Sequence, residues 1–244
     1  MPDQGRLTEQ RIPHTSPAIA PLYPPPPWKL PGVRVVKLMY ETDVEPLLAW
    51  LPPKLTRSSP PYAVITIAEL PETPIGPFSL AAQYLGCRAG FFIRALTLQA
   101  VTDSSMAMTA LREVWGYPCR LGTVGLASHG PLKTATVGEG GAPLAALEIT
   151  GAEPIEGDLV RFDPVLNLRV FPSLEEGKRH DLVQMVQIDP DYAVQTARRG
   201  KGTVEFPASG AESPWAVLPV RNIISATYCE MDTELPLARF VMPY

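Results

Sequence analysis

A cysteine and an arginine stand side by side at positions 119 and 120, just after Tyr117 and a proline. A cationic neighbour favours a thiolate, so Arg120 would make Cys119 a nucleophile or an acid/base group. Arg120 could also bind an anionic ligand group through two parallel hydrogen bonds. The alternatives are that Cys119 is a small apolar filler, since buried free cysteines are common and usually inert, and that Arg120 lies on the surface.

Arg112 and Glu113 precede this pair at the end of an expected helix. They could orient a substrate carbonyl or carboxylate, or they could form a buried ion pair that fixes the helix to the rest of the domain. Leu111 and Trp115 are four residues apart and share one helix face, so Glu113 points into a second environment, which could be a cavity.

Other polar candidates give weaker signals. Arg94 interrupts the apolar run at residues 91–100 and either faces a cavity or extends its charged end to solvent. His129 lies in a turn-like segment, and Lys133 follows it at the start of a strand. Ser104 and its neighbours fit a helix cap better than a hydrolytic site.

The composition indicates a globular protein with a substantial core, since 45% of the residues are hydrophobic and 19% charged. A net charge of -4, with no basic stripe, makes nucleic acid an unexpected partner. The three cysteines and three histidines are too widely spaced for a disulfide framework or a zinc site, so we expect no metal and no cofactor. The polar residues 1–11 and the lack of an apolar run of about 20 residues favour a cytoplasmic protein without membrane contact.

The 29 prolines favour a β-rich fold with many corners, because proline is largely excluded from helix interiors and central strands. Residues 1–31 read as an irregular arm, with Tyr23 and Trp28 as apolar anchors that drape it on the domain, and residues 32–244 as a single domain. The pattern predicts two helices, at residues 47–51 and from Ser104 or Ser105 to 115. It predicts strands at residues 33–40, 62–70, 91–100, 133–137, 144–150, 165–171 and 182–188, and weaker ones at 192–196, 202–206 and 222–231.

Residues 111–122 read Leu-Arg-Glu-Val-Trp-Gly-Tyr-Pro-Cys-Arg-Leu-Gly. This segment resembles the signature of the acetoacetate decarboxylase family, in which Arg-Glu is followed by a short apolar spacer, an aromatic-Pro pair and Lys-Lys-Leu-Gly. Landmarks at residues 15–18, 40–43, 164–168 and 218–225 extend the resemblance, in order, from about residue 12 to residue 235. It implies a mainly β fold, namely a closed antiparallel β-barrel with a few flanking helices and a small-molecule pocket inside.

The same resemblance points to missing catalytic groups. The family uses an activated lysine that forms a Schiff base with a β-keto acid, and this lysine maps to Cys119, while its charged neighbour maps to Arg120. Two family carboxylates map to Ile65 and Leu80. A thiol cannot form an iminium, so ordinary acetoacetate decarboxylation is not expected, and a relocated amine at Lys133 is a remote alternative.

We therefore expect a less charged, more apolar pocket that takes a larger ligand than acetoacetate. The predicted function is an enzyme of specialised metabolism, lyase- or cyclase-like, that acts on a polyketide-like or β-dicarbonyl compound by enolisation, cyclisation, dehydration or carbon–carbon cleavage without a Schiff base. The alternatives are a non-catalytic binding protein and covalent catalysis through Cys119. We also expect a homo-oligomer. The predicted catalytic residues are Cys119, Arg120 and Glu113, and the predicted substrate-binding residues are Trp115, Tyr117, Ile65, Leu80, Phe78 and Arg94.

Overall fold

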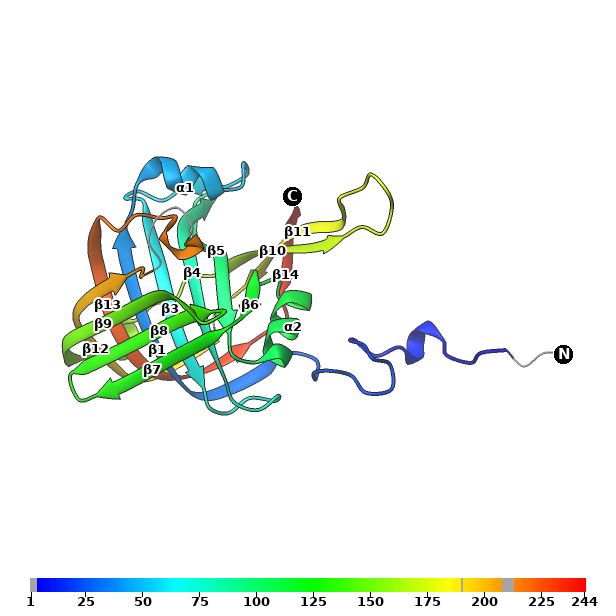
Figure 1. Ribbon diagram of the computed structural model, residues 1–244, viewed down its shortest axis with the longest axis horizontal. Helices are drawn as coiled ribbons and strands as arrows, with labels where there is room; N and C mark the ends of the chain where they lie inside the picture. Colours follow the sequence, from blue (N-terminus) through cyan, green and yellow to red (C-terminus); the bar gives the residue numbers. More distant parts are fainter. Residues whose placement is uncertain (1–3, 190, 208–212) are drawn as a thin grey trace.

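The computed structural model describes residues 4–189, 191–207 and 213–244, and most of them belong to one long, coiled β-sheet (Figure 1). The helical elements are η1 (Glu9–Arg11), α1 (Val44–Trp50), α2 (Ser105–Glu113), η2 (Gly157–Leu159) and η3 (Pro214–Ala216). The strands are β1 (Trp28–Glu41), β2 (Thr56–Arg57), β3 (Tyr62–Leu70), β4 (Phe78–Ala89), β5 (Phe92–Thr102), β6 (Cys119–Leu121), β7 (Thr123–His129), β8 (Leu132–Glu139), β9 (Ala142–Ile155), β10 (Val165–Pro172), β11 (His180–Ile188), β12 (Asp191–Glu205), β13 (Asn222–Leu235) and β14 (Arg239–Pro243).

The strands pair in the order β14-β11-β10-β5-β4-β3-β1-β13-β12-β9-β8-β7, with β2 added beside β4 and β6 beside β5. Adjacent strands are antiparallel except where β5 pairs with β10 and with β6. The order has two ends, β14 and β7, and no ladder of the described residues joins them. The prediction of a closed barrel is therefore wrong: the fold is mainly β, but the sheet is open.

The sheet buries side chains on both faces. Along β1, Val36, Leu38 and Tyr40 enter one core, while Val33 and Val35 enter the other, as the twofold side-chain period of a strand requires. The sheet folds back over the first core, so that its terminal strand β7 packs against β3, β4 and β5. The second core lies against α2 and the chain that follows it, and the candidate site belongs to this face.

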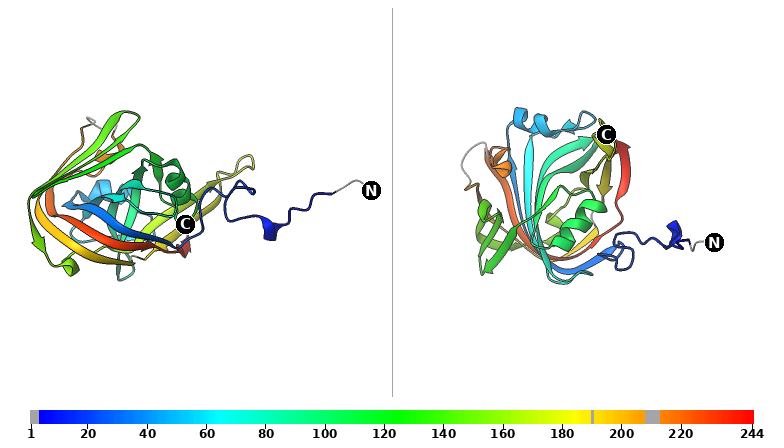
Figure 2. Two further views of the ribbon diagram at one scale, coloured as in Figure 1. Left: turned by 90° about the horizontal axis from the view of Figure 1, so that it is seen from below. Right: turned by 45° about the vertical axis from the view of Figure 1, so that its right-hand side comes forward.

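The N-terminal arm is anchored only near its base. Tyr23 and Trp28 are buried as predicted, but Trp28 already begins β1, inside the range expected to be arm. Thr15 is also buried, while Ile19, between Thr15 and Tyr23, is 97% exposed. Residues 4–12 are exposed and extend away from the domain (Figures 1 and 2), so this part of the arm is not draped on its own domain.

The two described α-helices contain 7 and 9 residues, and neither has the length that crossing a bilayer demands. Helix α2 begins as expected, with Ser104 Oγ accepting a hydrogen bond from the Ala107 N–H at 3.2 Å. It ends at Glu113, two residues before the predicted end. Strands β2, β4, β6, β7 and β14 were not predicted.

Candidate active site

A cavity of about 180 Å³ opens on the second face of the sheet. Its walls are mainly apolar, and the chain between η2 and β10 closes one side. A space of this size suits a ligand on the order of a benzene ring or slightly larger. The wall residues that matter for its chemistry are Val33, Val35 and Lys37 on β1, Val64 and Thr66 on β3, Leu80 and Tyr84 on β4, Tyr117, and Phe162 and Asp163 before β10.

Tyr84 and Tyr117 contribute hydroxyl groups to the mainly apolar wall of the cavity. Both are at least nine-tenths buried, and burial raises the pKa of each phenol above its ordinary value. They therefore remain protonated near neutral pH and can donate hydrogen bonds to a carbonyl oxygen. The prediction placed Tyr117 in the substrate pocket, and it does line this cavity.

Cys119 begins β6 behind this wall, in the apolar cluster that contains Tyr84 and Tyr117. The side chain is 1% exposed and is not part of the cavity lining. Burial raises the pKa of its thiol to about 12, although the charge of Arg112 acts in the opposite direction. The thiol points to the Arg120 carbonyl oxygen, with 3.8 Å between sulfur and oxygen. This environment keeps the thiol neutral at physiological pH.

The two arginines near Cys119 have roles that the sequence did not reveal. Arg120 is turned outward, where its Nε lies 2.7 Å from Glu139 Oε1 and its side chain is 63% exposed. Arg112 is the arginine whose charge acts on the thiol, and it donates a hydrogen bond to the Cys119 carbonyl oxygen at 3.1 Å.

Glu113 faces the arm. Its Oε2 accepts hydrogen bonds from the Tyr23 hydroxyl at 2.6 Å and from Thr15 Oγ1 at 3.2 Å. Glu113 thus anchors the base of the arm to the end of α2, and it does not line the 180 Å³ cavity.

The turn between α2 and β6 is fixed by backbone geometry and by β10. Gly116 has φ of 68°, and a Cβ added there would lie 2.9 Å from the Arg169 Cβ, so only glycine fits. Asn167 Nδ2 donates to the Trp115 carbonyl oxygen at 2.7 Å, and Arg169 Nε donates to the Glu113 carbonyl oxygen at 2.7 Å. Trp115 is fully buried against Trp28, with ring centroids 5.0 Å apart. These contacts set the position from which Tyr117 enters the cavity.

Three predicted pocket residues lie on different sides of β3 and β4. Leu80 lines the cavity, and Phe78 is buried in the same apolar cluster without reaching it. Ile65 belongs to the opposite core, because its neighbours Val64 and Thr66 take the cavity side of β3. Adjacent residues of a strand point to opposite faces, so a register error of one residue misplaces the side chain.

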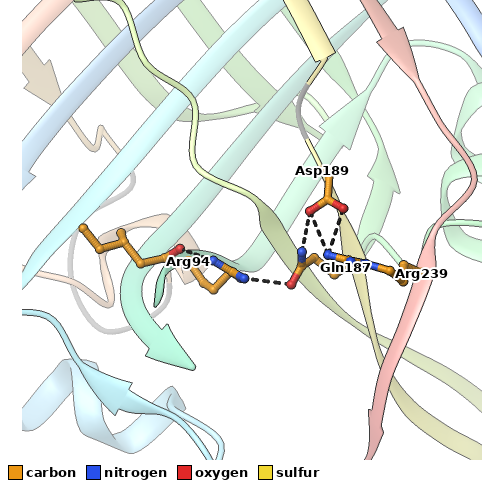
Figure 3. Close-up of polar contacts among 5 residues, drawn as sticks. Arg94, Gln187, Asp189 and Arg239 are labelled. Carbon is orange, nitrogen blue, oxygen red and sulfur yellow. Dashed lines mark hydrogen bonds and ion pairs between the residues drawn. The ribbon is translucent and has the colours of Figure 1, made fainter. Parts of the chain in front are cut away.

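Arg94 does not reach the cavity but starts a polar chain across three strands, shown in Figure 3. Its Nε donates to Gln187 Oε1 at 2.9 Å, Gln187 donates to Asp189, and Arg239 pairs with Asp189 at 2.9 Å. The chain connects β5, β11 and β14, and it holds the Asp189 carboxylate at one edge of the cavity.

No sequence pattern pointed to Lys37, which is the amine that lines the cavity. Lys133, the alternative amine, is instead tied to its own turn, donating to Ser128 Oγ and to the Gly130 carbonyl oxygen, each at 2.6 Å. Within the described part of the chain, no three His, Cys, Asp or Glu side chains gather closely enough to hold a metal ion. The cavity therefore combines an apolar wall, two neutral phenols, one amine and carboxylates.

Comparison with known proteins agrees with this architecture. The family description "Acetoacetate decarboxylase (ADC)" matches residues 11–244, so the chain belongs to the acetoacetate decarboxylase family. An acetoacetate decarboxylase of Chromobacterium violaceum is 26% identical over 239 residues, which cover 93% of this chain and 94% of that protein.

Solved structures show the same fold at lower identity. The acetoacetate decarboxylase of Legionella pneumophila aligns with a TM-score of 0.87 and 21% identity, covering 99% of both chains. The enduracididine biosynthesis enzyme MppR, complexed with the condensation product of pyruvate and imidazole 4-carboxaldehyde, aligns with a TM-score of 0.82 and 17% identity, covering 99% of this chain and 100% of that one. The named relatives are thus enzymes, and their fold extends over the whole chain.

Proposed function

We propose that this chain is an enzyme that binds a compact β-dicarbonyl or polyketide-like compound in the 180 Å³ cavity and transforms it without a Schiff base at position 119. The proposal rests on the chemistry of the Cys119 thiol. The neutral thiol of Cys119 lies behind the wall that Tyr84 and Tyr117 contribute to, so neither an imine nor a thiolate is supplied there.

The wall supports a carbonyl ligand with apolar substituents. Leu80, Val64 and Val33 offer apolar surface, whose burial favours binding by about 25 cal/mol for each Å² removed from water. The phenols of Tyr84 and Tyr117 supply hydrogen-bond donors at fixed positions. A dicarbonyl of about the size of acetylacetone fits inside, and a longer substituent would extend through the opening.

The chemistry proposed for this pocket is enolisation or a reaction that begins with it, such as cyclisation, dehydration or carbon–carbon cleavage. All of these need a carbonyl oxygen that is stabilised as negative charge develops on it. The acetoacetate decarboxylases are named for a small keto compound, and MppR binds the condensation product of pyruvate and imidazole 4-carboxaldehyde. Both relatives support carbonyl chemistry on this fold.

Binding of acetylacetone tests the location. Calorimetric titration of the purified protein should detect binding, and Leu80→Phe should weaken it at least about tenfold by filling the cavity. Leu48→Phe, the same substitution at an exposed position of α1, is the matched control and should bind like the native protein. Equal binding by native protein and Leu80→Phe, or no binding of β-dicarbonyls at all, would overturn the proposal.

A further inference from the structure

Lys37 is a partly buried lysine on the part of the cavity wall that β1 forms. It shares the inner face of β1 with Val33 and Val35, where an unpaired ammonium would be costly. Two protein groups interact with its charge in place of water. Lys37 Nζ donates to the Arg161 carbonyl oxygen and lies 4.8 Å from the centroid of the Phe162 ring, an arrangement that favours a cation.

Asp163 is the third group of this environment. It follows Phe162 directly and lines the same cavity. Burial lowers the pKa of Lys37, and the negative charge of Asp163 partly opposes that effect. Among the described residues no ion pair joins Lys37 directly to Asp163, so the two opposite charges border the cavity without neutralising each other by contact.

The two cavity carboxylates Asp163 and Asp189 differ in availability. The Asp189 carboxylate already accepts from Gln187 and Arg239 (Figure 3). For Asp163 the described residues supply no hydrogen-bond or ion-pair partner, so its carboxylate is free to accept a proton from a ligand. Lys37 has three N–H donors, and the Arg161 carbonyl oxygen takes one of them.

We propose that Asp163 and Lys37 form an acid–base pair that enolises a carbonyl compound bound in the cavity, Asp163 as the base and Lys37 as the donor to the oxygen. This deepens the proposed function and rests on it. The Asp163 carboxylate removes a proton from the carbon beside the carbonyl, and the C–H electron pair becomes the C=C bond of the enolate. The carbonyl π electrons move onto oxygen, where the Lys37 ammonium donates a hydrogen bond. Returning the proton from Asp163 to carbon restores the ketone, with no redox change.

The reaction can be followed as deuterium exchange in ethyl 2-methylacetoacetate, which has a single acidic C–H between two carbonyl groups. In D₂O, Asp163 exchanges its captured proton with solvent and returns deuterium to carbon, so the proton signal of that C–H disappears at an enzyme-dependent rate. The rate is measured by NMR after subtraction of the uncatalysed exchange, and binding of the same probe is measured separately by saturation transfer.

Lys37→Met and Asp163→Asn keep the size of each side chain while removing its function. Each should lower the enzyme-dependent exchange about 100-fold, the usual contribution of general acid–base catalysis, while the probe still binds. Lys29→Met, at an exposed position of the same strand, and Asp158→Asn, exposed in η2, are matched controls with native rates. If Lys37→Met does not fold, Asp163→Asn decides the question, because Asp163 lies outside the strands.

The pH profile distinguishes a chemical role from a structural one. Exchange should fall at high pH as Lys37 loses its proton, and the fall should begin below the ordinary range of lysine because burial lowers the pKa of Lys37. The other ionisable groups around Lys37 and the cavity are Cys229, Tyr84, Tyr117, Asp189, Tyr192 and Glu234.

Two outcomes would overturn the inference. The first is a probe that binds to the native protein but exchanges only at the uncatalysed rate, which would leave the binding proposal standing. The second is native exchange in both Lys37→Met and Asp163→Asn. Failure of the probe and of acetylacetone to bind would instead contradict the proposed function itself.

Discussion

The sequence alone allows two interpretations of Cys119, an activated thiol and a small apolar filler. Beside an arginine in the sequence, its thiol resembles an activated nucleophile. In the structure the neighbouring Arg120 pairs with Glu139, and burial dominates the thiol's chemistry. Glu113 was predicted to be catalytic, and in the structure its carboxylate accepts hydrogen bonds from Tyr23 and Thr15 of the arm.

The buried thiol has a measurable consequence. Because the pKa of Cys119 is raised to about 12, the thiolate is scarce below that pH, and reactivity should increase only as the pH approaches it. Iodoacetamide at pH 7 should modify Cys119 no faster than Cys87 or Cys229, whose pKa values burial also raises to about 12. Peptide mapping after timed labelling measures this, with unfolded protein as the reference. Selective rapid labelling of Cys119 would support the covalent mechanism instead.

Lys37 illustrates why part of the site could not be predicted at the residue scale. The alternation in β1 indicates a strand, but it does not say which face borders a cavity. That information comes from Phe162 and Asp163, which are more than a hundred positions away in the sequence and close over Lys37 in the fold. Tyr117 and Leu80 could be predicted because the family signature and its register carry them. Ile65 could not, because a shift of one residue reverses the face of a strand.

At the scale of elements, the connection from α2 to β6 decides where Tyr117 lies. Its carbonyl groups are held by Asn167 and Arg169 of β10. This gives a physical reason for two sequence landmarks to occur together, one at residues 111–122 and one at residues 164–168. The strands with strong alternation were predictable from sequence. The C-terminal end of α2 depends on its contact with β10. Strand β12 joins the two strands predicted at residues 192–196 and 202–206, and it depends on its pairing with β9 and β13.

Replacing Gly116 tests the rigidity of this connection. Gly116→Ala should cost about 1–2 kcal/mol for the left-handed backbone and about 2 kcal/mol more for the contact with Arg169, and it should weaken ligand binding by displacing Tyr117. Gly130→Ala is the control, since Gly130 also has a positive φ of 57° but has no atom within 4 Å of the added Cβ. Urea unfolding gives both free energies. Equal losses in the two variants would mean that the turn is not tightly packed against β10.

At the scale of the whole molecule, the closed barrel was predicted from the family resemblance and from regular turn signals, but the sheet is open. Closure depends on whether the terminal strands β14 and β7 meet, and no local pattern in either strand encodes that. The homo-oligomer stays a prediction. The exposed Ile19 and Leu7 of the extended arm (Figure 2) are apolar side chains that a second copy could cover.

We propose that the molecule uses the family fold without the family's covalent amine chemistry. The two cavity phenols, the buried Cys119 thiol and the Lys37 ammonium held by Arg161 and Phe162 all support this claim. The Arg161 carbonyl oxygen and the Phe162 ring favour the ammonium form of Lys37, against the burial that lowers its pKa. An ammonium is not a nucleophile, so we expect Lys37 to stabilise a negatively charged oxygen and not to attack the carbonyl carbon.

Borohydride trapping tests this claim most directly. The protein is incubated with acetoacetate or acetylacetone, treated with borohydride and weighed by intact mass spectrometry, alongside an acetoacetate decarboxylase that has the Schiff-base lysine. We expect an unchanged mass for this chain under conditions that label the reference enzyme. A stable adduct mapped to any lysine, with Lys37 the first to be checked, would contradict it.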